Sequence, residues 1–189
     1  MKTEPILNGD NIAIMSEPSV LPIDFVQNLI DNYRSNQLQA INKEMQTTDA
    51  HSIWFSLEKL KKLINDIETE TQKVDSSIGV KELGIRFYYA AYPKIEDWTR
   101  MEGYSIPDTY AGKHTLVMIP TLNRQDEQGN YFNFDFNPLD QNSYTEAVAG
   151  KGKGKGKIIA MAAKVAQQQT IADNHGTLSP PADPKAELF

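Results

Sequence analysis

Hydrophobic residues recur with the period of an α-helix in two segments of the first half of the chain. One segment opens at Pro22 and Asp24, and the other covers residues 57–73. Ser56 precedes the second segment and is a typical N-cap, because its hydroxyl can accept an N–H of the first turn. The pattern therefore predicts two amphipathic helices. Their apolar stripes consist of Phe25, Val26, Leu29, Ile30 and Tyr33 in the first and of Leu57, Leu60, Leu63, Ile64 and Ile67 in the second.

The sequence does not determine where the first helix ends, since no Gly or Pro occurs between residues 23 and 50. Leu38, Ile41 and Met45 extend its apolar stripe, and a break is expected near Ser35–Asn36. One long helix and two abutting helices both fit this pattern.

Runs of β-branched and aromatic residues predict four strands, at residues 53–55, 83–91, 114–119 and 131–136. Pro120 is expected to end the third strand. The polar residues 123–130 would join the last two strands as a hairpin. The segment between the second and third strands, residues 94–113, is long for a loop and is expected to hold a short helix around Glu96–Met101.

The two ends of the chain differ in composition from its centre. Residues 1–20 predict an arm in which residues 12–15 form an edge strand. A Gly-Lys run at residues 150–157 has low complexity, and the Ala/Gln-rich residues after it favour a helix that stops at Asn174-His175-Gly176. The last residues, 179–189, read as an extended tail.

These elements predict an α+β fold in which two or three helices pack on a small antiparallel or mixed sheet. We expect an N-terminal arm at residues 1–20 and a core domain at residues 21–140. Residues 141–189 would supply a Gly-Lys loop, an Ala/Gln-rich helix and a Pro-rich tail associated with that core. The apolar side of residues 57–67 is expected to be sealed against the strands.

Charge and hydropathy narrow the functional class. The net charge is −6, and without the four lysines of the Gly-Lys run 15 basic residues face 25 acidic ones. Such a surface argues against general binding to nucleic acid or to anionic membranes. No apolar run approaches the length of a membrane span, and the N-terminus lacks the long apolar region of a signal peptide. We therefore expect a soluble, cytoplasmic protein.

Several kinds of chemistry lack their sequence signals. The chain has no cysteine, which excludes disulfides and thiolate ligands. The Gly-Lys run fails the phosphate-binding pattern, because Ile158 stands where a Ser or Thr is needed. No G-x-S-x-G motif occurs, and the three histidines show neither HxH nor HExxH spacing. No catalytic residue, metal site or cofactor is therefore expected.

Arg86 and Tyr88 are the first candidate binding residues. They are two positions apart in a predicted strand and so share one of its faces. If this face lines a cleft, Arg86 can bind a carboxylate or phosphate and Tyr88 can donate a hydrogen bond. If the face lies against solvent or a helix, Arg86 pairs with an acidic side chain instead.

The remaining candidates come from the loop and from histidines. Trp98, Tyr104 and Tyr110 lie in residues 94–113 and would line a ligand pocket or a partner surface. His114 begins a predicted strand, and His175 lies in a sharp turn. The alternative for each of these residues is a purely structural role, in the core or at the surface.

The segments SIWFSLEKLKKLINDIE (residues 52–68) and GIRFYYAAYP (residues 84–93) resemble a group of small bacterial proteins of unknown function. The resemblance covers about residues 25–120, with an echo in NHGTLSPP near the end. No activity, cofactor or site residue follows from it.

The sequence thus predicts a non-enzymatic binding protein whose partner is another protein, a second copy of the chain or a small ligand. The alternative is a small hydrolase or metal-assisted enzyme that uses some of His51, Arg86, Tyr88, His114 and His175. Convergence of two histidines on one pocket would favour the enzyme.

Overall fold

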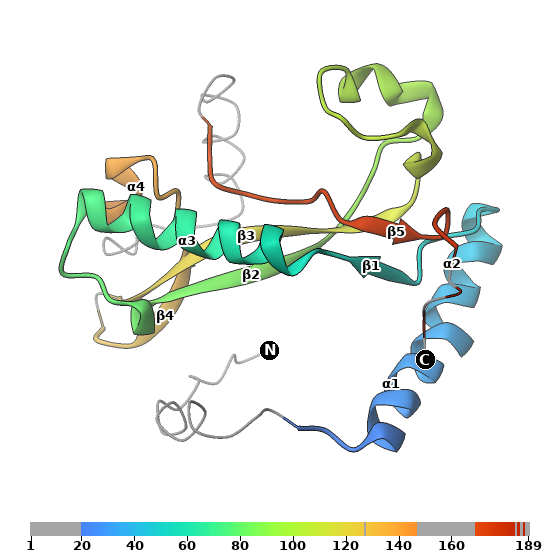
Figure 1. Ribbon diagram of the computed structural model, residues 1–189, viewed down its shortest axis with the longest axis horizontal. Coiled ribbons are helices and arrows are strands. Elements are labelled where there is room, and N and C mark those ends of the chain that lie inside the picture. The colour runs from blue at the N-terminus through green and yellow to red at the C-terminus, as the bar shows by residue number, and fades with distance from the viewer. Residues whose placement is uncertain (1–19, 127, 147–168, 184, 186, 188–189) are drawn as a thin grey trace. The chain divides into compact units, whose positions relative to one another are not determined.

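The computed structural model describes residues 20–126, 128–146, 169–183, 185 and 187. It has an α+β fold with one two-stranded and one three-stranded antiparallel sheet (Figure 1). The chain divides into two compact units. Unit 1 consists of residues 1–55, 89–116 and 175–189, and unit 2 of residues 56–88 and 117–174. The expected strand at 12–15 and the Gly-Lys run lie outside the described residues.

The described part of unit 1 contains two abutting helices, α1 (Ile23–Ser35) and α2 (Gln37–Met45). They are separated at Asn36, whose side-chain amide donates to the carbonyl of Asn32 at 2.8 Å. This local hydrogen bond competes with the helical pattern, as is common for Asn. The expected break near Ser35–Asn36 is thus confirmed, in the two-helix version.

The two-stranded sheet of unit 1 joins β1 (Ser52–Trp54) and β5 (Thr177–Ser179), with Ile53 opposite Leu178. Leu178 is fully buried in a core that also contains Ala50 and Tyr92. The loop between β2 (Leu83–Ala91) and β3 (His114–Gln125) covers this core through two short 3₁₀ helices, η3 (Ile95–Met101) and η4 (Asp108–Tyr110). The short helix expected near Glu96–Met101 is therefore present. The loop residues in the core are Trp98, Met101, Ile106 and Tyr110.

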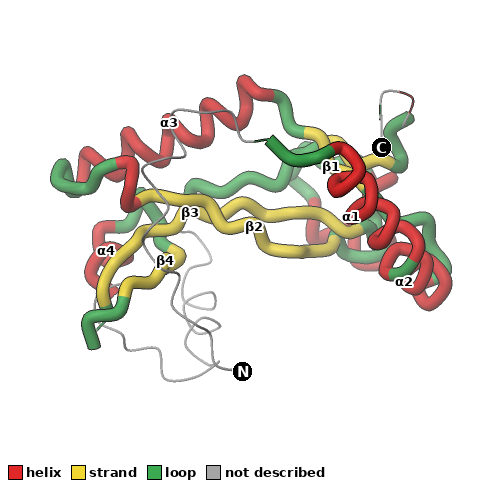
Figure 2. The backbone as a smooth tube through the Cα atoms, turned by 90° about the horizontal axis from the view of Figure 1, so that it is seen from below, coloured by secondary structure: helices red, strands yellow, loops and turns green. Residues whose placement is uncertain are grey.

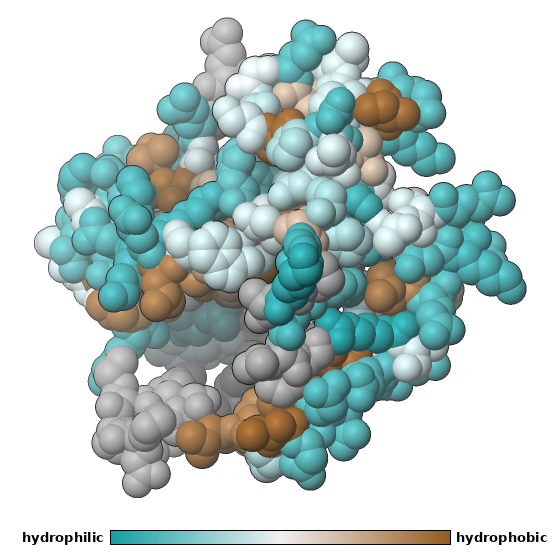
Figure 3. Space-filling model, turned by 45° about the vertical axis from the view of Figure 1, so that its right-hand side comes forward, coloured by the Kyte–Doolittle hydropathy of each residue, from teal (hydrophilic) through white to brown (hydrophobic). Residues whose placement is uncertain are grey.

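The apolar stripe of α1 is only partly covered. Val26, Ile30 and Tyr33 are half-buried, at the i, i+4, i+7 spacing of one helix face. Phe25 and Leu29 lie beside this line and are 47% and 55% exposed. Figure 3 shows hydrophobic side chains at the surface of one face of the molecule.

Unit 2 contains the helix α3 (Leu57–Val74). As expected, Ser56 is its N-cap, and the Ser56 hydroxyl accepts the N–H of Lys59 at 3.2 Å. The helix runs along β2 and β3 (Figures 1 and 2). Its buried residues are Leu63, Ile67 and Thr71, spaced four apart. The expectation that the whole stripe is sealed is wrong at Leu57 and Ile64, which are 72% and 44% exposed. These two positions flank the buried line, and Ile64 borders a pocket.

The three-stranded sheet has the order β2 (Leu83–Ala91), β3 (His114–Gln125), β4 (Tyr131–Asp135). β2 and β3 contribute residues to both units. The predicted hairpin of β3 and β4 is confirmed. Pro120 does not end β3: its carbonyl accepts the N–H of Phe136 at 3.1 Å, and the ladder with β4 starts at the next residue. The missing N–H of proline is therefore not needed.

The end of unit 2 departs from the sequence-based expectation. A short helix, α4 (Gln141–Glu146), was not expected, and its Tyr144 packs edge-on against Phe136. Residues 169–172, where the Ala/Gln-rich helix was expected to end, are not helical. Asp173 instead forms a β-bridge with Met118. Within the described part of the chain, no helix has the length and apolar character required to cross a membrane.

Candidate functional site

Asp49 in unit 1 is the centre of a buried hydrogen-bond cluster. Its side chain has no exposed surface, and one carboxylate oxygen accepts the N–H groups of Ala50 at 2.8 Å and of His114 at 2.7 Å. The other oxygen lies 2.5 Å from Nδ1 of His114. Because a carboxylate only accepts, Nδ1 carries the proton and Nε2 is the nitrogen that faces away from Asp49. Asp49 thus fixes both the backbone and the ring of His114.

Tyr33 of α1 adds a neutral hydroxyl near this cluster. Burial, followed by the negative charge of Asp49, raises the pKa of the Tyr33 phenol. Tyr33 therefore keeps its proton at neutral pH and can act as a hydrogen-bond donor.

A second cluster surrounds the carboxylate of Glu187. Arg34 Nη2 lies 3.2 Å from Oε2, and His51 Nδ1 lies 3.5 Å from the same oxygen. The hydroxyl of Ser52 donates to Oε1. Ser179 lies near enough to lower the pKa of this carboxylate, while its own hydroxyl donates to the carbonyl of Ala182 at 3.1 Å. We call Arg34, His51, Ser52 and Ser179 the carboxylate-binding cluster.

The fold explains why these four residues meet. Ser52 and Ser179 are direct partners in the β1–β5 pairing, so their side chains lie on the same face of the sheet. Arg34 lies in the last turn of α1, where the helix dipole favours a cation. His51 directly precedes β1. Three separated segments of the chain therefore meet around one anion.

The donors control the ionisation of Glu187. The hydrogen bond from Ser52 lowers the pKa of Glu187 most, and Ser179, His51 and Arg34 lower it further, against the opposing effect of burial. The carboxylate is therefore ionised at neutral pH. Its contribution to stability is complete above the usual pKa of about 4.5 and is lost as the pH falls through the lowered pKa.

His51 can take part in this cluster in two ways. Its Nδ1 lies 3.4 Å from Nη2 of Arg34 as well as 3.5 Å from Oε2 of Glu187. Arg34 can only donate, so that contact requires an unprotonated Nδ1, whereas the contact with Glu187 requires a protonated one. Nδ1 of His51 can therefore form only one of these two hydrogen bonds at a time.

We expect that replacing Ser52 with alanine raises the pKa of Glu187 towards its usual value, because the largest stabilisation of the charged form is removed. An NMR titration of the Glu187 side-chain carboxyl in both proteins measures this shift. Ser77→Ala is the control, since Ser77 bonds to Asp75 in unit 2. An unchanged Glu187 titration in Ser52→Ala would contradict the arrangement.

The structure brings the predicted residues Arg86 and Tyr88 together at Asp135 in unit 2. Arg86 Nη1 lies 2.5 Å from Oδ1 of Asp135, and Arg86 Nη2 donates to the carbonyl of Asn133 at 2.6 Å. The Tyr88 hydroxyl donates to Oδ2 of Asp135, which is the main reason that its pKa is raised. Arg86 thus pairs with an acidic side chain, as one of the two expected arrangements requires; that this face binds a ligand stays a prediction.

The predicted aromatic residues have different surroundings. Trp98 and Tyr110 contact Tyr92 in the core of unit 1, with ring centroids 6.2 Å and 5.7 Å from it, and the Tyr110 hydroxyl accepts the N–H of Leu178 at 3.1 Å. Tyr104 is 62% exposed. His175 is exposed and lies two residues before β5. That these residues bind a ligand stays a prediction.

The residues of the carboxylate-binding cluster were missed at the sequence level, except for His51. Arg34 and Ser179 carry no motif, and Ser52 stands beside a histidine without the spacing of a known site. Only the register between β1 and β5 places Ser52 opposite Ser179. The one local signal is that both serines adjoin an apolar strand residue.

His51 and His114 do not meet at one carboxylate: they contact Glu187 and Asp49, respectively. Among the described residues, no group of three or more His, Asp or Glu side chains is arranged to hold a metal ion. No protein-family model, curated protein or solved structure matches the chain. Functional proposals therefore depend on the geometry of this chain alone.

Proposed function

We propose that this chain is a binding protein and that the carboxylate-binding cluster of unit 1 recognises an acidic side chain of a peptide segment. The observation that carries the proposal is the convergence of Arg34, His51, Ser52 and Ser179 on the carboxylate of Glu187. In this structure the chain's own C-terminal segment supplies the acidic side chain. A partner with a similar segment would compete for the same donors.

The donor set is suited to an anion. Arg34 supplies charge, and the hydroxyl of Ser52 supplies a directed hydrogen bond to a carboxylate oxygen. The side chains of Arg34 and His51 are 30% and 19% exposed, so they are shielded from water without being closed off from a ligand. Hydrogen bonds to a charged group in such a setting contribute about 1.5–3 kcal/mol.

A peptide of residues 180–189 tests the proposal in trans. The receptor is the full chain with Glu187→Gln, which removes the internal carboxylate but keeps the cluster. We expect the labelled peptide to bind about tenfold or more tightly than the same peptide with Glu187→Gln, measured by fluorescence anisotropy. Adding Arg34→Gln to the receptor should abolish this preference.

The control receptor adds Arg100→Gln, which removes an exposed arginine that pairs only loosely, at 3.8 Å, with Asp97. It should bind the two peptides as the parent receptor does. Equal affinity of both peptides for the parent receptor would refute recognition of the carboxylate.

The alternative of a hydrolase or metal-assisted enzyme stays a prediction, as does self-association. The specific observation that bears on an enzyme is the contact of Asp49 with His114, which orients an imidazole in the manner of a general base.

A further inference from the structure

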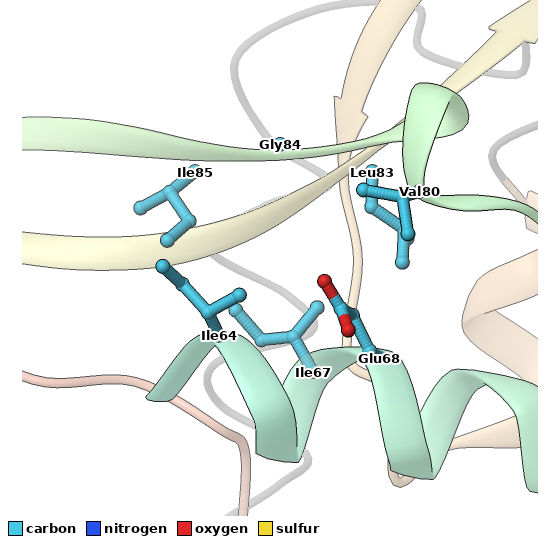
Figure 4. A pocket seen from close by; sticks show the side chains of 7 residues that line it. All are labelled: Ile64, Ile67, Glu68, Val80, Leu83, Gly84 and Ile85. Carbon is cyan, nitrogen blue, oxygen red and sulfur yellow. The ribbon is translucent and has the colours of Figure 1, made fainter. Parts of the chain in front are cut away.

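Unit 2 contains a pocket of about 260 Å³ between α3 and β2, which is unrelated to the carboxylate-binding cluster (Figure 4). Its walls are apolar except for one carboxylate, that of Glu68. The apolar side chains come from α3, from the 3₁₀ helix η2 (Val80–Glu82) and from β2. They are Ile64, Ile67, Val80, Leu83 and Ile85.

The pocket has a structural cause. Ile67 is buried, but Ile64 is 44% exposed and Val80 is 56% exposed, so the apolar layer between helix and strand is incomplete. Gly84, in the middle of this part of β2, contributes only backbone to the wall. Alanine at this position would not close the pocket, because its Cβ would point to Thr121, at 2.8 Å from Oγ1.

Glu68 is the unusual member of this lining. Its side chain extends from α3 into the space between the helix and β2 (Figure 4). Asp66 and Glu70 on the same helix are paired with Lys62 and Lys73. Within the described ranges of the chain, Glu68 has neither a hydrogen bond nor an ion pair. A carboxylate without a protein partner in an otherwise apolar wall can pair with the charge of a bound cation.

We propose that this pocket binds a small organic cation, an ammonium group attached to a short aliphatic chain. The ammonium would lie at Glu68 and the aliphatic part against Ile64, Ile67 and Ile85. The volume limits the buried part of the ligand to about nine heavy atoms at about 30 Å³ each. An anionic ligand is disfavoured, since the pocket holds a carboxylate and no cationic side chain.

The test compares three probes of equal length on the full chain: n-pentylammonium, pentan-1-ol and pentanoate. We expect n-pentylammonium to shift the methyl NMR signals of Ile64, Ile67 and Ile85 and to bind about tenfold or more tightly than the alcohol. Pentanoate should bind more weakly than the alcohol, because Glu68 repels it.

Two variants locate the effect. Glu68→Gln should remove the preference of the protein for the ammonium over the alcohol, whereas Glu70→Gln, on the same helix but outside the pocket, should keep it. Equal binding of ammonium and alcohol to the unmodified chain would overturn the proposal, and so would an ammonium preference that persists in Glu68→Gln. The probe comparison on the unmodified chain decides the question even if Glu68→Gln fails to fold.

Discussion

Replacing Gly176 with alanine is expected to lower the free energy of unfolding by about 3 kcal/mol. A Cβ at this position would lie 2.3 Å from Cγ2 of Ile53 and 2.7 Å and 2.9 Å from two ring carbons of Phe55. These distances are far below van der Waals contact, and all three atoms belong to side chains held beside the β1–β5 pair. The added methyl group must therefore push the strands apart or force a side chain out of its rotamer.

The other glycines of the chain supply matched controls. Gly79→Ala places its Cβ 3.6 Å from Oε2 of Glu82, an ordinary contact, so we expect a change of less than about 1 kcal/mol. Gly84→Ala meets only Oγ1 of Thr121, at 2.8 Å, and should fall between the two. Urea denaturation of the three variants measures the series. Equal stability of Gly176→Ala and Gly79→Ala would show that Gly176 is not closely packed.

The same substitution should affect the carboxylate-binding cluster, because Gly176 lies three residues before Ser179. If the methyl group separates β5 from β1, Ser179 moves away from Ser52 and the Glu187 carboxylate loses one of the groups that lower its pKa. Binding of the acidic peptide should then weaken together with stability. The sheet is thus both a structural element of unit 1 and the support of its proposed site.

Elements with a strong local signal could be predicted from the sequence. The helix at Leu57–Val74 has both an apolar stripe and a serine cap, and the strand at Leu83–Ala91 is rich in β-branched and aromatic residues. The α+β class follows from such elements. The sequence pattern of α3 does not distinguish its buried positions from the positions beside them. Leu57 and Ile64 were therefore expected to be buried, but they are exposed.

Elements that depend on distant partners could not be predicted. The residues Thr177–Ser179 look like the start of a tail after a turn, and they become a strand only because β1 is available for pairing. Pro120 looks like a strand end, yet β3 continues because its pairing with β4 begins at Thr121. The candidate site could not be predicted either, because Arg34, Ser52 and Glu187 are far apart in the sequence and meet only through tertiary structure.

The second large effect is expected for Asp49→Ala, which should lower the free energy of unfolding by about 3 kcal/mol. The substitution leaves the N–H groups of Ala50 and His114 without their acceptor, and Ala50 is 94% buried. Each unsatisfied buried donor costs about 1–3 kcal/mol. The ring of His114 also loses its partner but is 38% exposed, so water can replace part of that contact.

Asp49→Asn separates the two functions of this carboxylate. The amide oxygen of asparagine can still accept both backbone N–H groups, so most of the stability should be retained. The amide nitrogen, however, is a donor and would face Nδ1 of His114, which must then give up its proton and accept. We therefore expect a loss of about 1 kcal/mol, together with a change of the His114 tautomer that ¹⁵N NMR of the imidazole detects.

Asp66→Ala is the control for both Asp49 variants, because Asp66 forms only a surface i,i+4 pair with Lys62 and should contribute less than about 0.5 kcal/mol. If Asp49→Ala were no more destabilising than Asp66→Ala, the buried cluster would not hold unit 1 together. We expect the free energy of unfolding to fall most in Asp49→Ala, less in Asp49→Asn and least in Asp66→Ala. The reason is that asparagine keeps an acceptor for the backbone N–H groups, whereas the imidazole, which loses its acceptor in both Asp49 variants, is partly open to water. A loss as large for asparagine as for alanine would instead assign the stabilisation to the contact between Asp49 and the His114 ring.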